Sequence, residues 1–380
     1  MRSSRSASRN GKTDKPGAAM SDQPMVFEEW TTNGGGRIAV ARLNSPRNLN
    51  SLSMDMIRLL KPQLQRWADD DSVCAVWLEA EGDKAFCAGG DIVSLYRSMT
   101  EPGKLAEGER FFTEEYELDY LIHTFPKPVV CWGNGIVMGG GIGLMAGASH
   151  RVVTEHSKLA MPEVSIGLYP DIGAGWFLNR MPGRTGMFLG LTGTRMNPAD
   201  ALFVGMADRF VSHELKGQVI DALASANWQG SSAHSVVSSV LRQYEQQSRE
   251  ALPASAVRDH FDDIQQATDG DSLEQVVAQL KDLSGSEGWL GKAVKGLASA
   301  SPTSLALTWK HLQRSQRDSL KQVLDNELVM SVNCLKKGEF AEGIRALLID
   351  KDMQPRWRYA SLAELDNEWI EAFFSQAPGH

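Results

Sequence analysis

Two glycine-rich segments are the parts of this sequence whose composition and position most suggest chemistry. AFCAGGD (residues 85–91) and VMGGGIG (residues 137–143) each follow an apolar run typical of a buried strand. Such loops leave backbone N–H groups accessible, and the first N–H groups of a helix have no partner within the helix. Two N–H groups that converge on one carbonyl oxygen form an oxyanion hole. One such loop alone is more often a tight turn, but the pair together favours a site.

Three acidic residues are the next candidates. Glu163 and Asp171 lie in MPEVSIGLYPDIG (residues 161–173) among apolar and small residues. Burial there raises the pKa of a carboxyl toward neutrality, which suits a proton acceptor or donor. For Glu163, an ion pair with an arginine or a helix cap after Pro162 explains the pattern equally well. Asp171 follows Pro170 and precedes Gly173, and taken alone it is more often a turn residue. Glu115 follows Glu114 in a predicted helix, where acidic runs usually face solvent.

Other catalytic patterns are weaker. Cys87 has no histidine beside it in sequence that would activate its thiol, and no G-x-S-x-G nucleophile motif is present. Gly141, Gly143 and Ala146 satisfy G-x-G-x-x-A, with Glu155 after the next predicted strand, as in a dinucleotide-binding unit. The helix between them is about two turns long, which is short for that unit.

Composition excludes several classes of function. The chain has 380 residues and a formal net charge of -8, so a general nucleic-acid binder is not expected. No window approaches the roughly 20 apolar residues of a membrane span. The four cysteines are widely spaced and the histidines form no metal-ligating pattern, so we expect neither disulfides nor a metal. This usage predicts a reducing, cytoplasmic compartment.

The elements that position these residues follow a repeated order. Strands are predicted at 37–43, 73–78, 129–132 and 151–154, and helices at 53–69 and 111–125, with glycine turns between them. Repetition of strand, turn and helix predicts an α/β fold. We divide the chain into a disordered basic extension (residues 1–22), a catalytic core (residues 23–225) and a helical C-terminal region (residues 226–380).

Three segments together resemble the enoyl-CoA hydratase/isomerase (crotonase) superfamily: AFCAGGDI (residues 85–92), MGGGIG (residues 138–143) and AMPEVSIGLYPDIGAGWFL (residues 160–178). The resemblance continues in SPTSL (residues 301–305) and FAEGIRALLIDKD (residues 340–352). It implies a crotonase-like spiral of ββα units followed by a helical C-terminal region. The superfamily forms homo-oligomers, and the altered C-terminal region leaves the assembly state open.

The resemblance also implies roles for single residues. The superfamily's oxyanion hole uses backbone N–H groups at the positions of Gly90 and Gly140, which would hold a thioester carbonyl oxygen. The loop at residues 45–49 would contact the nucleotide of coenzyme A (CoA), with Arg47 and Leu49 as candidate contacts. CoA is part of the substrate, so no separate cofactor is expected.

Departures from the hydratase pattern indicate the reaction. Hydratases use two glutamates, and this sequence keeps only the second, Glu163, because Gly143 stands at the first position. With Asp171 and Glu115, this combination resembles the 3-hydroxyisobutyryl-CoA hydrolase family, whose contacts fall at Glu115, Gly140, Glu163 and Asp171. The resemblance implies hydrolysis of that thioester, a step of valine catabolism, with Glu163 activating water or attacking directly. The alternatives are an enoyl-CoA hydratase or isomerase, and a non-catalytic binding protein of the same fold.

Overall fold

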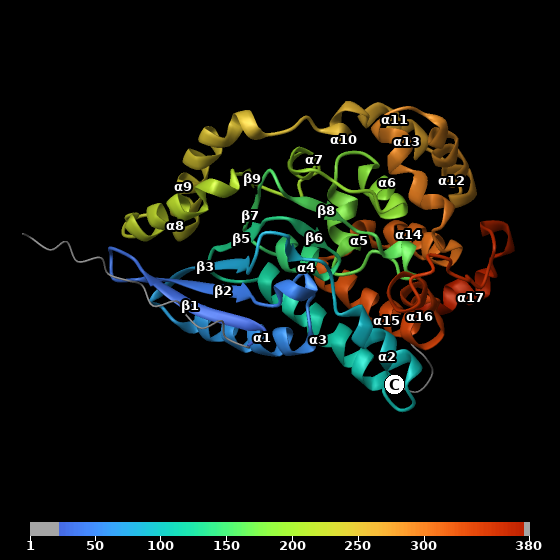
Figure 1. Ribbon diagram of the computed structural model, residues 1–380, viewed down its shortest axis with the longest axis horizontal. Coiled ribbons are helices and arrows are strands. Elements are labelled where there is room, and N and C mark those ends of the chain that lie inside the picture. Colours follow the sequence, from blue (N-terminus) through green and yellow to red (C-terminus); the bar gives the residue numbers. More distant parts are fainter. Residues whose placement is uncertain (1–22, 376–380) are drawn as a thin grey trace, which may run out of the picture.

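The fold is built on two sheets whose strands alternate along the chain. The computed structural model describes residues 23–375, and the predicted extension at residues 1–22 lies outside them (Figure 1). A six-stranded sheet has the order β1-β2-β3-β5-β7-β9, and a three-stranded sheet has the order β4-β6-β8. The strands are β1 (Met25–Thr31), β2 (Arg37–Leu43), β3 (Val73–Ala80), β4 (Ala85–Cys87), β5 (Val129–Gly133), β6 (Ile136–Met138), β7 (His150–Val153), β8 (Lys158–Ala160) and β9 (Arg209–Phe210).

Consecutive strands form repeated units. In the pairs β3–β4, β5–β6 and β7–β8, the first strand joins the large sheet and the second joins the small sheet. All pairings are parallel except β1 with β2. Because each unit enters both sheets in the same direction, the loops between paired strands and the following helices gather at one edge. The predicted spiral of ββα units is confirmed.

Helices of the first half pack against the large sheet and beside the small one. Ser53 caps the first helix, since its hydroxyl accepts a hydrogen bond from Met56 N at 3.2 Å. The predicted helix at 111–125 begins earlier, at Leu105, and ends at His123. The helices are α1 (Met54–Asp69), α2 (Ile92–Thr100), α3 (Leu105–His123), α4 (Gly140–Ala146), α5 (Ala174–Phe177), α6 (Thr185–Thr192), α7 (Pro198–Phe203) and α8 (Lys216–Ser225).

The C-terminal half is helical, as its sequence predicts. It runs along one side of the molecule from the large sheet (Figure 1), and its helices at residues 320–337 and 340–344 pack against α3 and α2. These helices are α9 (Ala233–Ser248), α10 (Ala256–Asp259), α11 (Phe261–Ala267), α12 (Leu273–Asp282), α13 (Trp289–Ala293), α14 (Pro302–Arg314), α15 (Leu320–Lys337), α16 (Phe340–Ile344) and α17 (Asn367–Glu371).

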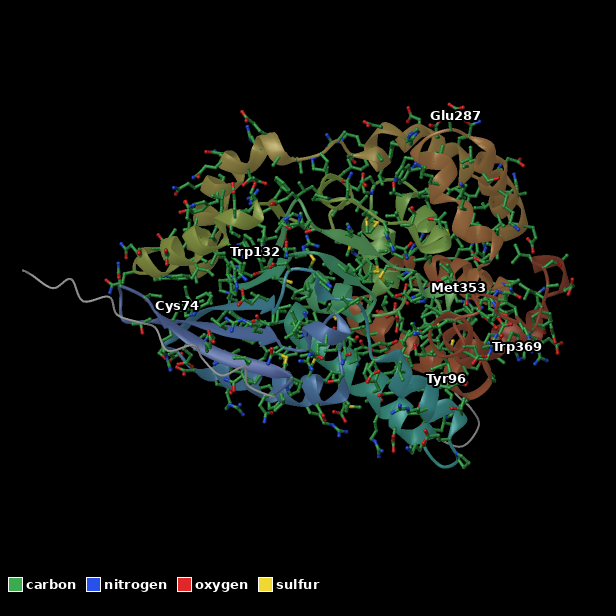
Figure 2. All side chains as sticks on the ribbon, viewed as in Figure 1. Cys74, Tyr96, Trp132, Glu287, Met353 and Trp369 are labelled. Carbon is green, nitrogen blue, oxygen red and sulfur yellow. The ribbon has the colours of Figure 1, made fainter. Side chains whose placement is uncertain are left out.

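Two hydrophobic clusters hold these layers together. The smaller lies between the large sheet and helices α8 and α9, and Trp132 marks its place in Figure 2. The rings of Trp77 and Trp132 stack there with their centroids 5.4 Å apart. The larger fills the other side and includes residues from both halves of the chain. The predicted domain boundary near residue 225 stays a prediction, and the larger hydrophobic cluster contains residues from both sides of it. Over residues 23–375, no helix has the length and apolarity that crossing a bilayer requires.

Candidate active site

A cavity of about 430 Å³ lies where the two glycine loops, α3 and the segment after β8 meet. Its lining includes every residue that the sequence nominated for catalysis or for the acyl group: Gly90, Glu115, Gly140, Glu163 and Asp171. Leu49 also lines the cavity, whereas the exposed Arg47 is not among the lining residues. Residues far apart in sequence therefore share one cavity, and Arg47 as a CoA contact stays a prediction.

The backbone at Gly90 turns its N–H away from the neighbouring strand-like segment. Leu52 N donates to Gly89 O at 2.8 Å, and Asp91 N donates to Leu52 O at 2.9 Å. In a parallel bridge of this kind, the residue between the two bonded groups directs its own N–H to the opposite side. The N–H of Gly90 therefore points away from Leu52 and is available on the cavity side.

The second glycine loop approaches the first closely. Gly140 is the first residue of α4, so its N–H has no acceptor within the helix. A methyl group on Gly140 would lie 3.4 Å from Gly90 N, and one on Gly141 would clash with Cys87 O. Gly139 adopts φ 47°, which favours glycine. The glycines bring the backbone at residues 90 and 140 side by side, an arrangement that can bind one oxyanion.

Glu163 stands in a short 3₁₀ turn (Glu163–Ser165) at the wall of the cavity. Its exposed fraction is 4%, and among residues 23–375 its Oε2 atom has no hydrogen-bond partner. A methyl group on Gly139 would lie 3.2 Å from its Oε1 atom, so the carboxyl reaches the second glycine loop. Burial raises the pKa of Glu163 well above the usual range, and the nearby Asp171 raises it further. Among residues 23–375, Glu163 does not form the ion pair that its sequence context allowed.

Asp171 has a defined hydrogen-bond donor. Tyr116 Oη donates to Asp171 Oδ2 at 2.5 Å, and Tyr116 Oη also lies 2.7 Å from Ser331 Oγ. Burial raises the pKa of Asp171 to about 7, against the lowering effect of the Tyr116 hydrogen bond, and the charge of Glu327 raises it further. Of the acids that line the cavity, Asp171 has a hydroxyl donor that favours its ionised form.

The loop that carries Asp171 is held from the C-terminal half. Glu327, on α15, accepts hydrogen bonds from Gly173 N at 2.6 Å and from Gly175 N at 3.0 Å. The loop includes Ile172 at φ 58°, a conformation that is rare for β-branched residues and costs about 1–3 kcal/mol. Helix α15 thus fixes a strained backbone beside a site residue.

Glu115 and Glu114 point in different directions although they are adjacent. Glu114 pairs with Arg58 at 2.7 Å near the surface. Glu115 is buried, with an exposed fraction of 2%, and a methyl group on Gly140 would clash with its Oε1 atom. The solvated-face interpretation of the acidic run therefore fits Glu114 but not Glu115. Burial raises the pKa of Glu115 well above the usual range, and the charge of Asp119 raises it further.

Sequence reasoning did not single out four residues around the cavity: Tyr116, Asp119, Arg195 and Glu327. A signal for two of them exists, because the buried face of α3 includes Tyr116 and Asp119 among its apolar residues. Arg195 is the one basic residue among those that line the cavity, it is exposed, and no ion pair forms with it in the described chain. It lies in an irregular loop, where no pattern marks it.

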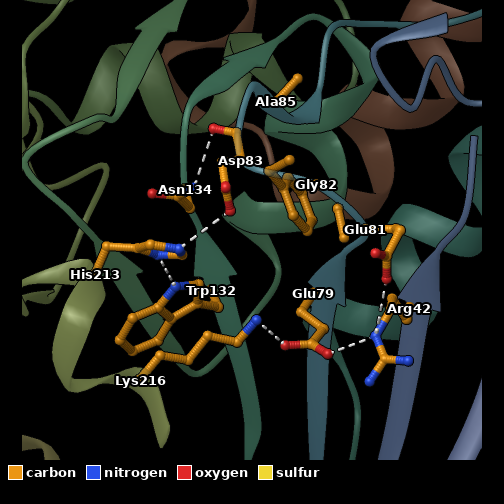
Figure 3. Close-up of a pocket in the computed structure, with 12 residues that line it drawn as sticks. Arg42, Glu79, Glu81, Gly82, Asp83, Ala85, Trp132, Asn134, His213 and Lys216 are labelled. Atoms are coloured by element: carbon orange, nitrogen blue, oxygen red, sulfur yellow. Dashed lines mark hydrogen bonds and ion pairs between the residues drawn. The ribbon is translucent and has the colours of Figure 1, made fainter. Parts of the chain in front are cut away.

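A second cavity of about 480 Å³ lies under α8, at the ends of β3 and β5. Its central acid is Glu79, which pairs with Arg42 at 2.7 Å and with Lys216 at 2.5 Å (Figure 3). Trp77 Nε1 donates to Glu79 at 2.9 Å. The acid at the centre of this cavity is therefore paired, unlike Glu163 in the first cavity.

Sequence comparison finds relatives over nearly the whole chain. The 3-hydroxyisobutyryl-CoA hydrolase, mitochondrial, of Danio rerio is 39% identical over 90% of this chain and 87% of its own length. The human protein of the same name is 36% identical over 93% of this chain and 90% of its own length.

Two solved structures are similar in both sequence and fold. An enoyl-CoA hydratase from Rhodobacter sphaeroides has a TM-score of 0.79 and 34% identity, over 93% of this chain and 97% of that one. A carnitinyl-CoA dehydratase from Mycobacterium thermoresistibile has a TM-score of 0.82 and 34% identity, over 94% and 98%. The family model for enoyl-CoA hydratase/isomerase matches residues 38–374. Together with the shared ββα spiral, this match shows that the chain belongs to the enoyl-CoA hydratase/isomerase family.

Proposed function

We propose that this protein hydrolyses acyl-CoA thioesters, with 3-hydroxyisobutyryl-CoA as its main substrate. The observation that carries the proposal is one cavity in which two glycine-loop amides adjoin Glu163, whose Oε2 atom has no partner in the described chain. Relatives at 36–39% identity that bear the name of that hydrolase support the choice of substrate. The chemistry needs only the substrate, water and these side chains, so CoA enters as part of the substrate.

The reaction follows from the geometry. The thioester oxygen accepts hydrogen bonds from the N–H groups of Gly90 and Gly140, which stabilise the negative charge that develops on it. Glu163 takes a proton from a water whose oxygen attacks the carbonyl carbon. The C–S bond then breaks, and the leaving thiolate takes the proton that Glu163 accepted, which restores the Glu163 carboxylate. In the alternative route, Glu163 attacks directly, and water hydrolyses the resulting anhydride.

Two further acids act on the substrate or the water. Asp171, ionised near neutral pH, accepts a hydrogen bond from the attacking water or from the 3-hydroxyl of the substrate. Glu115 forms a hydrogen bond to the 3-hydroxyl of the substrate. Arg195, at the exposed rim, provides a cation for a phosphate of CoA. It is the one basic residue among those that line the cavity, so its charge favours binding of a polyanionic substrate.

The test is thiol release by the purified chain from 3-hydroxyisobutyryl-, 3-hydroxypropionyl- and crotonyl-CoA. We expect release from the first two, and loss of release in Glu163→Gln while binding of the CoA ester is retained. Glu114→Gln is the matched control, because Glu114 carries the same charge near the surface. Near-normal turnover by Glu163→Gln would refute the role of Glu163. After a single turnover in ¹⁸O-water, label in the Glu163 carboxyl identifies the anhydride route with attack of water at the Glu163 carbonyl, because the general-base route leaves the Glu163 oxygens unexchanged.

Hydration of an enoyl-CoA is the competing function, and both similar solved structures bear hydratase or dehydratase names. Gly143 disfavours hydration, because a glycine supplies no acid where hydratases have their first glutamate. Loss of the enoyl absorbance without free thiol would identify a hydratase. Tight binding of CoA esters with neither reaction would identify a binding protein of the same fold.

The compartment and the assembly state belong to the same proposal. The cysteine usage favours a reducing, cytoplasmic location, whereas the relatives bear the word mitochondrial in their names. Imaging of the tagged full chain in its own cells decides between these two locations. Light scattering of the purified chain measures whether it forms a homo-oligomer.

A further inference from the structure

Asp119 is a buried acid that the proposed reaction does not use. Its exposed fraction is 0%, and neither carboxyl oxygen has a hydrogen-bond partner among residues 23–375. It lies four residues after Glu115 on α3, so the two side chains share one face of the helix, with Cβ atoms about 5–6 Å apart. Burying a carboxyl without a partner is costly, especially in its ionised form. The position therefore calls for a functional reason.

Helix α4 accommodates this acid only because residue 143 is glycine. A methyl group on Gly143 would lie 2.8 Å from both Asp119 carboxyl oxygens. Contacts this short do not occur at a Cβ atom without a shift of one partner. The position at which hydratases place a glutamate is thus closed by the carboxyl of Asp119, which comes from a different helix.

Glu115 is the residue through which the charge of Asp119 can influence the cavity. Its Oε1 atom contacts Gly140 and lies 3.9 Å from the position of a methyl group on Gly90. It therefore borders the two amides that would hold the thioester oxygen. An ionised Glu115 would repel the negative charge that develops there, whereas a protonated Glu115 adds no charge and donates a hydrogen bond.

We propose that Asp119 is a positioning residue: once it ionises at alkaline pH, its charge on the shared face of α3 keeps Glu115 protonated, so that Glu115 still donates a hydrogen bond to the bound substrate beside the oxyanion site. The inference rests on the proposed thioester hydrolysis for its catalytic meaning. The acid pair itself rests on the burial of Asp119 and on its place one helical turn from Glu115.

The electrostatic surroundings agree with this assignment. Burial raises the pKa of Glu115 first, and Asp119 is the largest contribution from any charge. Burial also raises the pKa of Asp119, and the charges of Asp171 and Glu327 raise it further. In the described chain no cation opposes these effects. The pKa of His123, lowered by burial to about 4, leaves that ring neutral. The titratable groups around the pair are Cys87 on β4, Tyr116 and His123 on α3, Glu163 and Asp171 before α5, and Glu327 on α15.

The pH dependence of kcat/KM tests the proposal. In the wild type, activity falls at alkaline pH when Glu115 finally ionises. Asp119→Asn removes the neighbouring charge but keeps the shape, so this alkaline limb moves about one to two pH units lower. Below the limb, kcat/KM stays at the wild-type level. Glu115→Gln removes the limb, and adding Asp119→Asn to it produces no further shift.

An unmoved alkaline limb in Asp119→Asn, with normal thermal unfolding, would overturn the proposal. A second measurement depends neither on activity nor on the folding of that variant. The infrared band of the protonated Glu115 carboxyl, assigned by its loss in Glu115→Gln, should persist in the wild type above the pH at which Asp171 ionises. Its absence at neutral pH would also overturn the proposal. If the wild type releases no thiol, the proposed function fails, while the infrared titration still decides whether Glu115 stays protonated.

Discussion

Removing the hydroxyl of Tyr116 changes one interaction at Asp171 and leaves the backbone of the site in place. In Tyr116→Phe, Asp171 loses the donor at 2.5 Å that favours its ionised form. Ser331 keeps a second partner, because Tyr169 Oη lies 2.9 Å from its Oγ atom. The substitution therefore isolates the effect of the hydroxyl on the charge of Asp171.

The size of the effect follows from the energy of that hydrogen bond. A hydrogen bond to a charged group contributes about 1.5–3 kcal/mol, which equals about 1–2 pKa units. The pKa of Asp171 in the wild type is about 7. It rises to about 8–9 in the variant, so at pH 7 the ionised fraction falls from about one half to about 1–10%. We expect kcat/KM at pH 7 to fall about 5- to 50-fold and to recover toward the wild-type value near pH 9.5.

The assay is thiol release from pH 5 to 10, corrected for uncatalysed hydrolysis of the thioester. The direction of the shift is the critical result: activity requires the ionised form, so a raised pKa moves the acidic limb to higher pH. Tyr169→Phe is the matched control, since it disturbs the same Ser331 network without removing a bond to Asp171. A Tyr116→Phe profile that is lower at every pH, or one with an unmoved limb, would refute the reasoning.

Three further predictions use the same site. Asp171→Asn should abolish turnover and raise the free energy of unfolding by about 2–4 kcal/mol at pH 8 but not at pH 4. A buried carboxyl with a raised pKa destabilises the folded protein as the pH rises through that window, and the amide removes this cost. Urea unfolding at the two pH values measures it. Gly140→Ala should lower kcat about 100- to 1000-fold, because the methyl group clashes with Glu115 and displaces the amide; single-turnover kinetics measures it. Arg195→Ala should raise KM about 3- to 10-fold at low salt with little change at high salt, whereas Arg242→Ala, on the distant α9, should not.

The fold could be predicted from the sequence where hydrophobic period and glycine turns agree. The strand at residues 37–43 and the helix opened by Ser53 are observed within a residue of the prediction. The proximity of the two glycine loops could be predicted, because both follow buried strands and the ends of such strands meet at one edge of a parallel sheet. The ends of α3 could not be placed, since the acids of its first turns hid the buried stripe that begins before Phe111.

The supporting residues of the site could not be predicted in the same way. Glu327 is separated from Gly173 by a large part of the chain, and only tertiary packing of α15 brings its carboxylate to that loop. Arg195 stands in a loop without periodicity. Asp119 had a visible position on an apolar helix face, but interpreting it requires the contact with Gly143, which comes from a separate element.

The site combines two requirements that different parts of the fold satisfy. Parallel strands deliver backbone amides at fixed positions, and such donors carry no charge that a buried position would have to neutralise. The acids come from α3, from the loop before α5 and from α15, so their mutual repulsion is set by helix packing. Among residues 23–375, no basic side chain pairs with Glu163, and Asp171 has only a hydroxyl donor. A cation there would lower the pKa of these carboxyls and also attract the thioester oxygen away from the amides. Because none in the described chain pairs with them, the pKa values of these carboxyls stay raised.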